Sequence, residues 1–385
     1  MSSCAVRPSQ SPHGAHVARR TSPAPDRATF GVALYGDFVA TEDDWTSYSE
    51  GLGSYAMTTA RAHLTRDDLA SLSREALGRV PAAVTRLRGG SKKGVYRLAL
   101  GNGRSAIAYV WSPDEDYWGP VDADIRDPFA HASGLGLFLS AHDLLTELGV
   151  RTPRLLFADE DAEHLPAYAA VVEDVRGGSL ELLLRSDPGA ARVPLARLAG
   201  TLGVLRERVS SGYGKAVLVE EGGTPLGSSC EQVVADRAIR DIAEVADRDP
   251  RLRQVRQALA ERVQQLYDAV EPRETASLVH GELGPDHVLV TEEGDPALID
   301  IEGLMYFDAE WEHVFLQLRF GPAYDVLRTA DLDEDRTALY RLAMHLNLVA
   351  GPLRLLDGDF PDREPMRDIA ESSLRKVLSL LRGAS

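Results

Sequence analysis

Residues 280–303, HGELGPDHVLVTEEGDPALIDIEG, decide the fold of this chain. The stretch contains two histidines, several carboxylates and two short apolar runs, which we predict to be strands at Val288–Val290 and Ala297–Ile299. The intervening EEGD is rich in turn-forming residues, so the two strands should form a hairpin. A hairpin is a rigid support, and it would hold the polar residues beside it at a fixed spacing.

Three of these polar residues flank the predicted strands. Glu282 lies on the loop before the first strand, His287 follows five residues later, and Asp300 comes directly after the second strand. Phosphoryl transfer requires a carboxylate near the acceptor hydroxyl and metal-binding groups near the phosphates. Because the hairpin would supply both kinds of group, we predict phosphate chemistry for this stretch.

A second hypothesis is an iron site with two histidines and one carboxylate as ligands. Sites of this kind would require a jelly-roll fold with many short strands. The second half of this chain is dominated by helical patterns, so we favour phosphate chemistry.

The composition is that of a globular protein with an acidic surface. Of the 385 residues, 44% are hydrophobic and 26% are charged, and the net charge is −17. Such a surface repels nucleic acids and attracts cationic substrates or basic peptides, although many cytoplasmic proteins are simply acidic. No run approaches the ~18 apolar residues of a membrane span. We therefore expect neither nucleic acid nor a membrane as a partner.

The cysteine content predicts a reducing compartment. Cys4 and Cys230 are the only cysteines, which argues against a disulfide framework and a multi-cysteine zinc site. We therefore expect a cytoplasmic protein.

The first part of the chain has the pattern of a small α+β lobe. We predict a helix at 65–77, strands at 83–90, 94–100 and 105–112, a loop at 112–133, a helix at 136–150, and strands at 154–159 and 167–175. The GNG turn before residue 105 is a strong hairpin signal. The lobe should therefore contain an antiparallel sheet and one long helix.

The second part of the chain is predicted to be mostly helical. Helical patterns occur at 179–185, 194–210, 229–247, 251–271, 308–319, 333–350 and 362–382. We predict a disordered tail at 1–28, an N-terminal extension at 29–78, a nucleotide-binding lobe at 79–176 and a helical lobe at 177–385.

The segment from His280 to Asp300 resembles the catalytic segment of the aminoglycoside phosphotransferase superfamily. The pattern of that superfamily is H-G-D-x-x-x-x-N, a strand, a turn and a strand that ends in I-D. VVEDVRGGSLELLL at 171–184 also resembles the hinge of these enzymes, and GVRTPRLLFAD at 149–159 resembles the passage that precedes it. The resemblance spans residues 80–320 and implies an α+β, protein-kinase-like two-lobed fold, with a small antiparallel β-sheet lobe and a larger helical lobe.

The resemblance implies roles for five residues of this segment. Glu282 takes the place of the catalytic aspartate, with one more methylene, and Asp300 takes the place of the main Mg²⁺ ligand. His287 replaces a metal-binding asparagine, and Glu302 is expected to bind or orient a second metal ion. His280 belongs to the same catalytic segment, where it should hold the loop through hydrogen bonds.

Acidic residues continue after this segment. By the same resemblance, Asp308 and Glu312 should fix the segment to the helix that follows. The alternative for Asp308 is a helix N-cap. Substrate contacts are expected from the helical lobe and from the acidic loop after residue 300.

The resemblance also implies a glycine-rich loop over the nucleotide phosphates. The residues of this loop are Gly89, Gly90, Ser91, Lys92, Lys93 and Gly94. Relatives carry a lysine on the third strand and a glutamate on the next helix, but Tyr109 and Phe138 fill those positions here. We expect Lys92 and Lys93 to supply the missing positive charge from the loop. The alternative is that both are solvated turn residues.

The implied cofactors are ATP or GTP, with Mg²⁺. Glu173 and Val175 of the hinge-like segment are expected to line the nucleotide site. The implied activity is transfer of phosphate to a hydroxyl of a cationic antibiotic or other small metabolite, or to a Ser or Thr of a natural-product precursor peptide. In the peptide case a partner lyase would eliminate the phosphate. Because Tyr109, Phe138 and Glu282 depart from the pattern, the alternative is a pseudokinase that binds a nucleotide or a partner protein without turnover.

Overall fold

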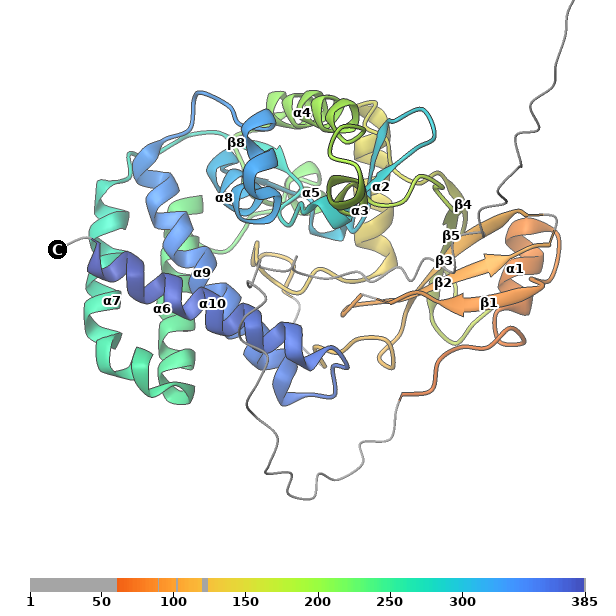
Figure 1. The fold of residues 1–385 in the computed structure, drawn as a ribbon, viewed down its shortest axis with the longest axis horizontal. Coiled ribbons are helices and arrows are strands. Elements are labelled where there is room, and N and C mark those ends of the chain that lie inside the picture. Colours follow the sequence, from red (N-terminus) through yellow and green to blue (C-terminus); the bar gives the residue numbers. More distant parts are fainter. Residues whose placement is uncertain (1–60, 89, 102, 120–123, 384–385) are drawn as a thin grey trace, which may run out of the picture. The chain divides into compact units, whose positions relative to one another are not determined.

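The computed structural model describes residues 61–88, 90–101, 103–119 and 124–383 (Figure 1). The predicted disordered tail at 1–28 lies outside these residues, as does Gly89 of the predicted glycine loop. Of the predicted extension at 29–78, the structure describes residues 61–78.

The small lobe is built around one antiparallel sheet, as predicted. Its strands are β1 Ala83–Arg86, β2 Gly94–Ala99, β3 Ser105–Trp111, β4 Leu155–Asp159 and β5 Tyr168–Glu173, in the order β1-β2-β3-β5-β4. Its helices are α1 Ala70–Leu77 and α2 Leu135–Glu147. The helix predicted from residue 65 begins later, because Thr65 and Asp68 form a turn in which the Asp68 carboxylate accepts a hydrogen bond from the Thr65 N–H at 2.7 Å.

The sheet of the small lobe is covered on both faces. Ala106 and Val110 of β3 belong to one core with Leu72 of α1, and Figure 1 shows α1 beside the orange strands. Tyr109 of β3 belongs to the larger core with Phe138 of α2. Because successive side chains of a strand point to opposite faces, the continuous apolar run of β3 is buried on both sides.

The large lobe is mostly helical. Its helices are α3 Leu180–Ser186, α4 Arg192–Glu207, α5 Ala216–Glu220, α6 Cys230–Arg248, α7 Pro250–Ala269, α8 Ala309–Phe320, α9 Glu334–Asp357 and α10 Arg363–Arg382. All the predicted helices of this lobe are present, and α5 was not predicted. None of the described helices is both long and apolar enough to cross a membrane.

Two small sheets lie among these helices. The predicted hairpin consists of β9 Val288–Val290 and β10 Pro296–Leu298. A four-stranded antiparallel sheet combines β6 Val209–Ser210, β8 Ala276–Val279, β11 Met305–Phe307 and β7 Gly214–Lys215, in that order. We did not predict this second sheet, because two of its strands contain two residues each and pair with distant segments.

The hinge between the lobes packs directly on the hairpin. The Val290 N–H donates a hydrogen bond to the Gly178 carbonyl at 2.9 Å. A Cβ atom at Gly177 would lie 1.7 Å from the Val290 carbonyl oxygen, so only glycine permits this approach. The hairpin is therefore held against the end of the hinge.

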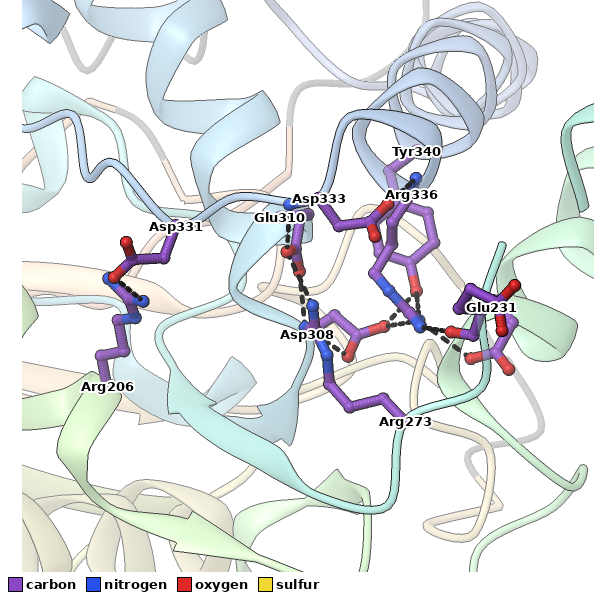
Figure 2. A network of polar contacts seen from close by, with 10 residues as sticks. Arg206, Glu231, Arg273, Asp308, Glu310, Asp331, Asp333, Arg336 and Tyr340 are labelled. Atoms are coloured by element: carbon purple, nitrogen blue, oxygen red, sulfur yellow. Dashed lines mark hydrogen bonds and ion pairs between the residues drawn. The ribbon is translucent and has the colours of Figure 1, made fainter. Parts of the chain in front are cut away.

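A buried ion-pair network fastens the segment after the hairpin to the helical lobe (Figure 2). Asp308, before α8, accepts hydrogen bonds from Arg336 Nη1 at 2.5 Å and from the Tyr340 hydroxyl of α9. The same guanidinium donates to Glu231 of α6 at 3.0 Å. Asp308 does occupy the N-cap position of α8, but its side chain makes no capping hydrogen bond and binds Arg336 and Tyr340 instead.

Three acidic residues at the start of α8 are buried. Asp308, Glu310 and Glu312 are at most 4% exposed. Glu310 is paired with Arg273 at 2.8 Å, within the network of Figure 2. The contacts of Asp308 and Glu312 agree with the expectation that these acids fix the segment to α8 and its neighbours.

Candidate active site

The loop before the hairpin presents Glu282 to solvent. Its side chain is 58% exposed, and Glu282 Oε2 lies 3.5 Å from Lys92 Nζ. The Lys92 charge lowers the pKa of Glu282, which is therefore ionised at neutral pH. His287 supports the loop through a 2.8 Å hydrogen bond between its Nδ1 and the Glu282 carbonyl oxygen. A carboxylate in this position can accept a proton from a hydroxyl.

Asp300 stands between the hairpin and a short 3-10 turn. Its backbone is left-handed, with φ 59° and ψ 45°, a conformation that Asp and Asn tolerate better than most residues. Burial alone would raise the pKa of Asp300, but the charge of Lys93 outweighs it and holds the pKa well below its usual value. The side chain is 32% exposed, so this carboxylate is ionised and reachable.

Lys93 connects the small lobe to the hairpin. Its Nζ lies 2.7 Å from Asp300 Oδ1 and 2.5 Å from Glu302 Oε1. The Lys93 side chain is 7% exposed and that of Lys92 is 21% exposed. The alternative of two solvated turn lysines is therefore wrong. Each lysine pairs with acids of the catalytic segment.

The glycine loop is held from outside by the segment after β3. The Tyr117 N–H donates to the Ser91 carbonyl oxygen at 2.8 Å, and Trp118 Nε1 donates to Ser91 Oγ at 2.8 Å. Gly90 has φ +83°, and a Cβ there would lie 2.8 Å from the Lys93 carbonyl oxygen. The loop is thus shaped so that Lys93 turns toward Asp300.

Tyr109 and Phe138, at the positions where the resemblance implies a lysine and a glutamate, form an aromatic pair. Tyr109 and Phe138 meet edge to face, with ring centroids 5.6 Å apart. Lys93 Nζ lies 5.3 Å from the centroid of the Tyr109 ring. Lys93 of the glycine loop therefore places a positive charge beside the Tyr109 ring of β3.

The hinge offers unpaired backbone groups. Glu173 ends β5, and its carboxylate binds Arg151 at 2.7 Å. Val175 is 8% exposed, and among the described residues its backbone N–H and C=O have no hydrogen-bond partner. Buried backbone groups are nearly always paired, so this position suits a ligand with donor and acceptor edges.

The predicted metal ligands form an open set. Glu302 Oε2 is buried and has no hydrogen-bond partner in the described part of the chain. His287 Nε2 lies 3.8 Å from Asp300 Oδ2. Within the described ranges, no three His, Cys, Asp or Glu side chains enclose a metal position. Mg²⁺ commonly binds one or two carboxylates together with substrate phosphates and water, so the set fits a shared ion and not a closed protein cage.

Most of the chain matches the sequence profile of a known enzyme family. The sequence profile of the phosphotransferase enzyme family matches residues 84–345, from β1 into α9. The chain belongs to the phosphotransferase enzyme family. No curated protein matches the chain.

Solved structures of aminoglycoside phosphotransferases share the fold of this family member. The apo form of a thermostable mutant of APH(4)-Ia has a TM-score of 0.57 and 17% identity, over 83% of this chain and 99% of that chain. Spectinomycin phosphotransferase APH(9)-Ia, with ADP and spectinomycin, has a TM-score of 0.57 and 13% identity, over 83% and 98%. The GDP complex of aminoglycoside 2'-phosphotransferase-IIIa has a TM-score of 0.53 and 17% identity, over 83% and 99%. The predicted two-lobed α+β fold is confirmed.

Two buried groups support the loop before the hairpin in this phosphotransferase family member. His280 Nε2 is 3.0 Å from the Ile299 carbonyl oxygen, and burial lowers the pKa of His280 to about 4. Glu312 of α8 accepts a hydrogen bond from the Gly281 N–H at 2.6 Å. Burial raises the pKa of Glu312 to about 7. Both groups hold the loop and neither reaches solvent.

Replacing Glu312 by glutamine should remove a pH dependence of stability. The folded pKa is about 7 against 4.5 for the free side chain, so stability from this group is present below pH 4.5 and is lost as pH rises through 7. Between pH 5 and pH 8, the unfolding free energy of the wild type should fall relative to Glu312→Gln by up to ~3 kcal/mol. Urea unfolding at both pH values measures this difference. The prediction would be contradicted if the wild type and Glu312→Gln differed in unfolding free energy by the same amount at pH 5 and at pH 8.

One residue of the site was not predicted from the sequence. Only four of the 42 basic residues are lysines: Lys92, Lys93, Lys215 and Lys376. Lys215 of β7 is 5% exposed, and Lys92 and Glu282 are among the charges that act on it. Three of the four lysines therefore gather at the catalytic segment. Because lysines are rare in this sequence, their positions could have drawn attention to Lys215.

Proposed function

We propose that this protein transfers the γ-phosphate of ATP or GTP to an alcohol hydroxyl. The observation that carries the proposal is the meeting of Lys92 and Lys93 with the acids of the catalytic segment, at 2.5–3.5 Å. Phosphoryl transfer requires this combination of a phosphate-binding cation, a metal-binding carboxylate and a carboxylate near the acceptor.

Each acid has a distinct task. The exposed Glu282 orients the acceptor hydroxyl and accepts its proton. Asp300 would hold Mg²⁺, with Glu302 and His287 completing the protein side of the site. Bound Mg²⁺ would neutralise charge on the phosphates. The 2.8 Å contact of His287 Nδ1 with the Glu282 carbonyl oxygen is compatible with the tautomer that leaves Nε2 free for an ion.

The nucleotide would lie between the hinge and the glycine loop. The free backbone groups of Val175 suit the edge of a base, next to Glu173. Gly90, Ser91 and Gly94 shape the loop over the phosphates. Lys93 of this loop would leave Asp300 and bind the phosphates when the nucleotide is bound. Structures with the same fold contain ADP or GDP, which supports ATP or GTP as the donor.

The acceptor is a hydroxyl of a small molecule or of a peptide. Structures with this fold contain hygromycin B, spectinomycin or kanamycin, which supports an antibiotic or another small metabolite. A Ser or Thr of a precursor peptide, followed by phosphate elimination by a partner lyase, is the second acceptor class. Either reaction would take place in the cytoplasm, where ATP and GTP are abundant.

A pseudokinase is the second candidate function. It is favoured by Lys93, which fills the space between Asp300 and Glu302 that a cation would otherwise take. Such a protein would bind nucleotide or a partner without turnover.

Phosphate transfer, measured for the wild type and for Glu282→Gln, separates the phosphotransferase from the pseudokinase. The amide cannot accept a proton, so transfer of labelled phosphate from ATP to hygromycin B, spectinomycin, kanamycin or Ser/Thr peptides should fall ~100-fold or more. Affinity for ATP and Mg²⁺ should remain unchanged. Glu147→Gln, at an exposed position of α2, is the matched control. If the wild type binds nucleotide without hydrolysing or transferring phosphate, the pseudokinase is supported and the transferase is wrong.

A further inference from the structure

Lys215 is a buried basic residue without a direct carboxylate partner. Its residue is 5% exposed, and among the described residues its ammonium has no hydrogen-bond or ion-pair partner. The other buried basic residues discussed above, Lys93 and Arg336, each contact two carboxylates. An unpaired buried ammonium is costly, which indicates a partner that the chain itself does not supply.

Strand pairing directs Lys215 toward the catalytic loop. Lys215 of β7 pairs with Met305 of β11, so their side chains share one face of the sheet. Met305 packs on the loop, because its Cε would lie 3.2 Å from a Cβ at Gly281. Gly281 directly precedes Glu282. Burial, with the charges of Lys92 and Arg237, lowers the pKa of Lys215 to about 8, and the charge of Glu282 opposes this shift.

Charges of the site and of its surroundings act on Lys215. Lys92 and Glu282 are the strongest of these charges, and Arg237 of α6 and Asp127 follow. A Cβ at Gly214 would lie 3.9 Å from Pro128. Arg237 stacks over Phe129 at 4.6 Å. By contrast, Lys93 sits on Asp300 and Glu302, where nucleotide phosphates are expected. The two lysines therefore serve different parts of the reaction.

We propose that Lys215 binds an anionic group of the acceptor, a carboxylate or a phosphate, next to the hydroxyl that Glu282 orients. This inference rests on the proposed phosphotransferase function and narrows its acceptor. A polycation such as kanamycin would be repelled by Lys215 and Arg237, whereas a hydroxy acid or an acidic peptide would be attracted. The overall charge of −17 makes such a local cationic site necessary for an anionic acceptor.

Sulfate is a simple probe of this site. The full chain is first saturated with the non-hydrolysable ATP analogue AMP-PNP and Mg²⁺, and sulfate binding is then measured by calorimetry. The wild type should bind one sulfate per chain, and Lys215→Met should weaken binding about tenfold or more. Lys376→Met, at an exposed lysine of α10, should leave it unchanged. Kanamycin should not bind the wild type and should gain affinity in Lys215→Glu.

Three results would overturn the role of Lys215. They are equal sulfate affinity in Lys215→Met and wild type, sulfate binding that AMP-PNP abolishes, and tight kanamycin binding by the wild type. The second result would make Lys215 a contact of the nucleotide phosphates. Failure of AMP-PNP to bind at all would instead contradict the proposed phosphotransferase, so the two failures are distinguishable.

The melting temperature of Lys215→Met tests whether Lys215 only stabilises the fold. If the ammonium is kept for a ligand, Lys215→Met removes an uncompensated buried charge, and the melting temperature without ligand should rise or stay equal. A fall in melting temperature accompanied by unchanged sulfate binding would show that Lys215 only supports the fold.

Discussion

Asp300→Asn should reduce phosphoryl transfer about a thousandfold, because loss of one preorganised charge at a phosphoryl-transfer site has effects of this size. Asparagine keeps the shape of the side chain and tolerates the left-handed backbone at φ 59°. The substitution therefore removes the charge on the carboxylate and little else. Initial rates with labelled ATP, at saturating Mg²⁺ and any acceptor found for the wild type, measure the effect.

The control for this result lies on the same hairpin. Asp295 is exposed in the turn and pairs with Arg197 at 2.8 Å. Asp295→Asn should leave the rate within a factor of two. Equal rates of phosphoryl transfer for Asp300→Asn and the wild type would show that Asp300 is not an active-site residue.

Arg336→Met should lower the free energy of unfolding by ~3–5 kcal/mol, because it leaves buried carboxylates without their cation. Arg336 is 1% exposed and binds Asp308 and Glu231. It also donates to the Glu271 carbonyl oxygen at 2.6 Å. Urea unfolding followed by circular dichroism measures the change.

A neighbouring arginine of the same helix provides the comparison. Arg341 of α9 binds Gln317 at the surface at 3.3 Å, so Arg341→Met should change stability by less than ~0.5 kcal/mol. Adding Asp308→Asn to Arg336→Met should recover part of the loss, since one unpaired charge is removed. Equal effects of the two arginine substitutions would show that the network of Figure 2 adds no stability.

The parts of the fold that depend on neighbouring residues could be predicted from the sequence. The strands of the small lobe are rich in β-branched and aromatic residues, and the first three are separated by glycine-containing segments such as Gly101–Gly103. The hairpin at 288–298 is marked by its turn residues. The sheet of β6, β8, β11 and β7 could not be predicted, because two of its strands have only two residues each and its strands pair with segments that are distant in the sequence.

The residues of the candidate site were proposed from the sequence, but their contacts could not be. The spacing of Glu282, His287 and Asp300 follows from the family pattern, which the match to the phosphotransferase family supports. That Lys93 would bridge Asp300 and Glu302 depends on the approach of two lobes, and no local pattern encodes it. Lys215 was missed for the same reason: β7 reaches the catalytic loop only through its pairing with β11.

The central claim is that Asp300 binds a metal ion that also binds the nucleotide. This ion would lie beneath the lysines of the glycine loop. A crystal structure with AMP-PNP and Mn²⁺, examined for anomalous scattering at the manganese edge, tests it most directly. We expect a manganese peak on the Asp300 carboxylate, with Lys93 moved from Asp300 to the phosphates. A nucleotide bound without manganese, and with Lys93 still between Asp300 and Glu302, would contradict the claim.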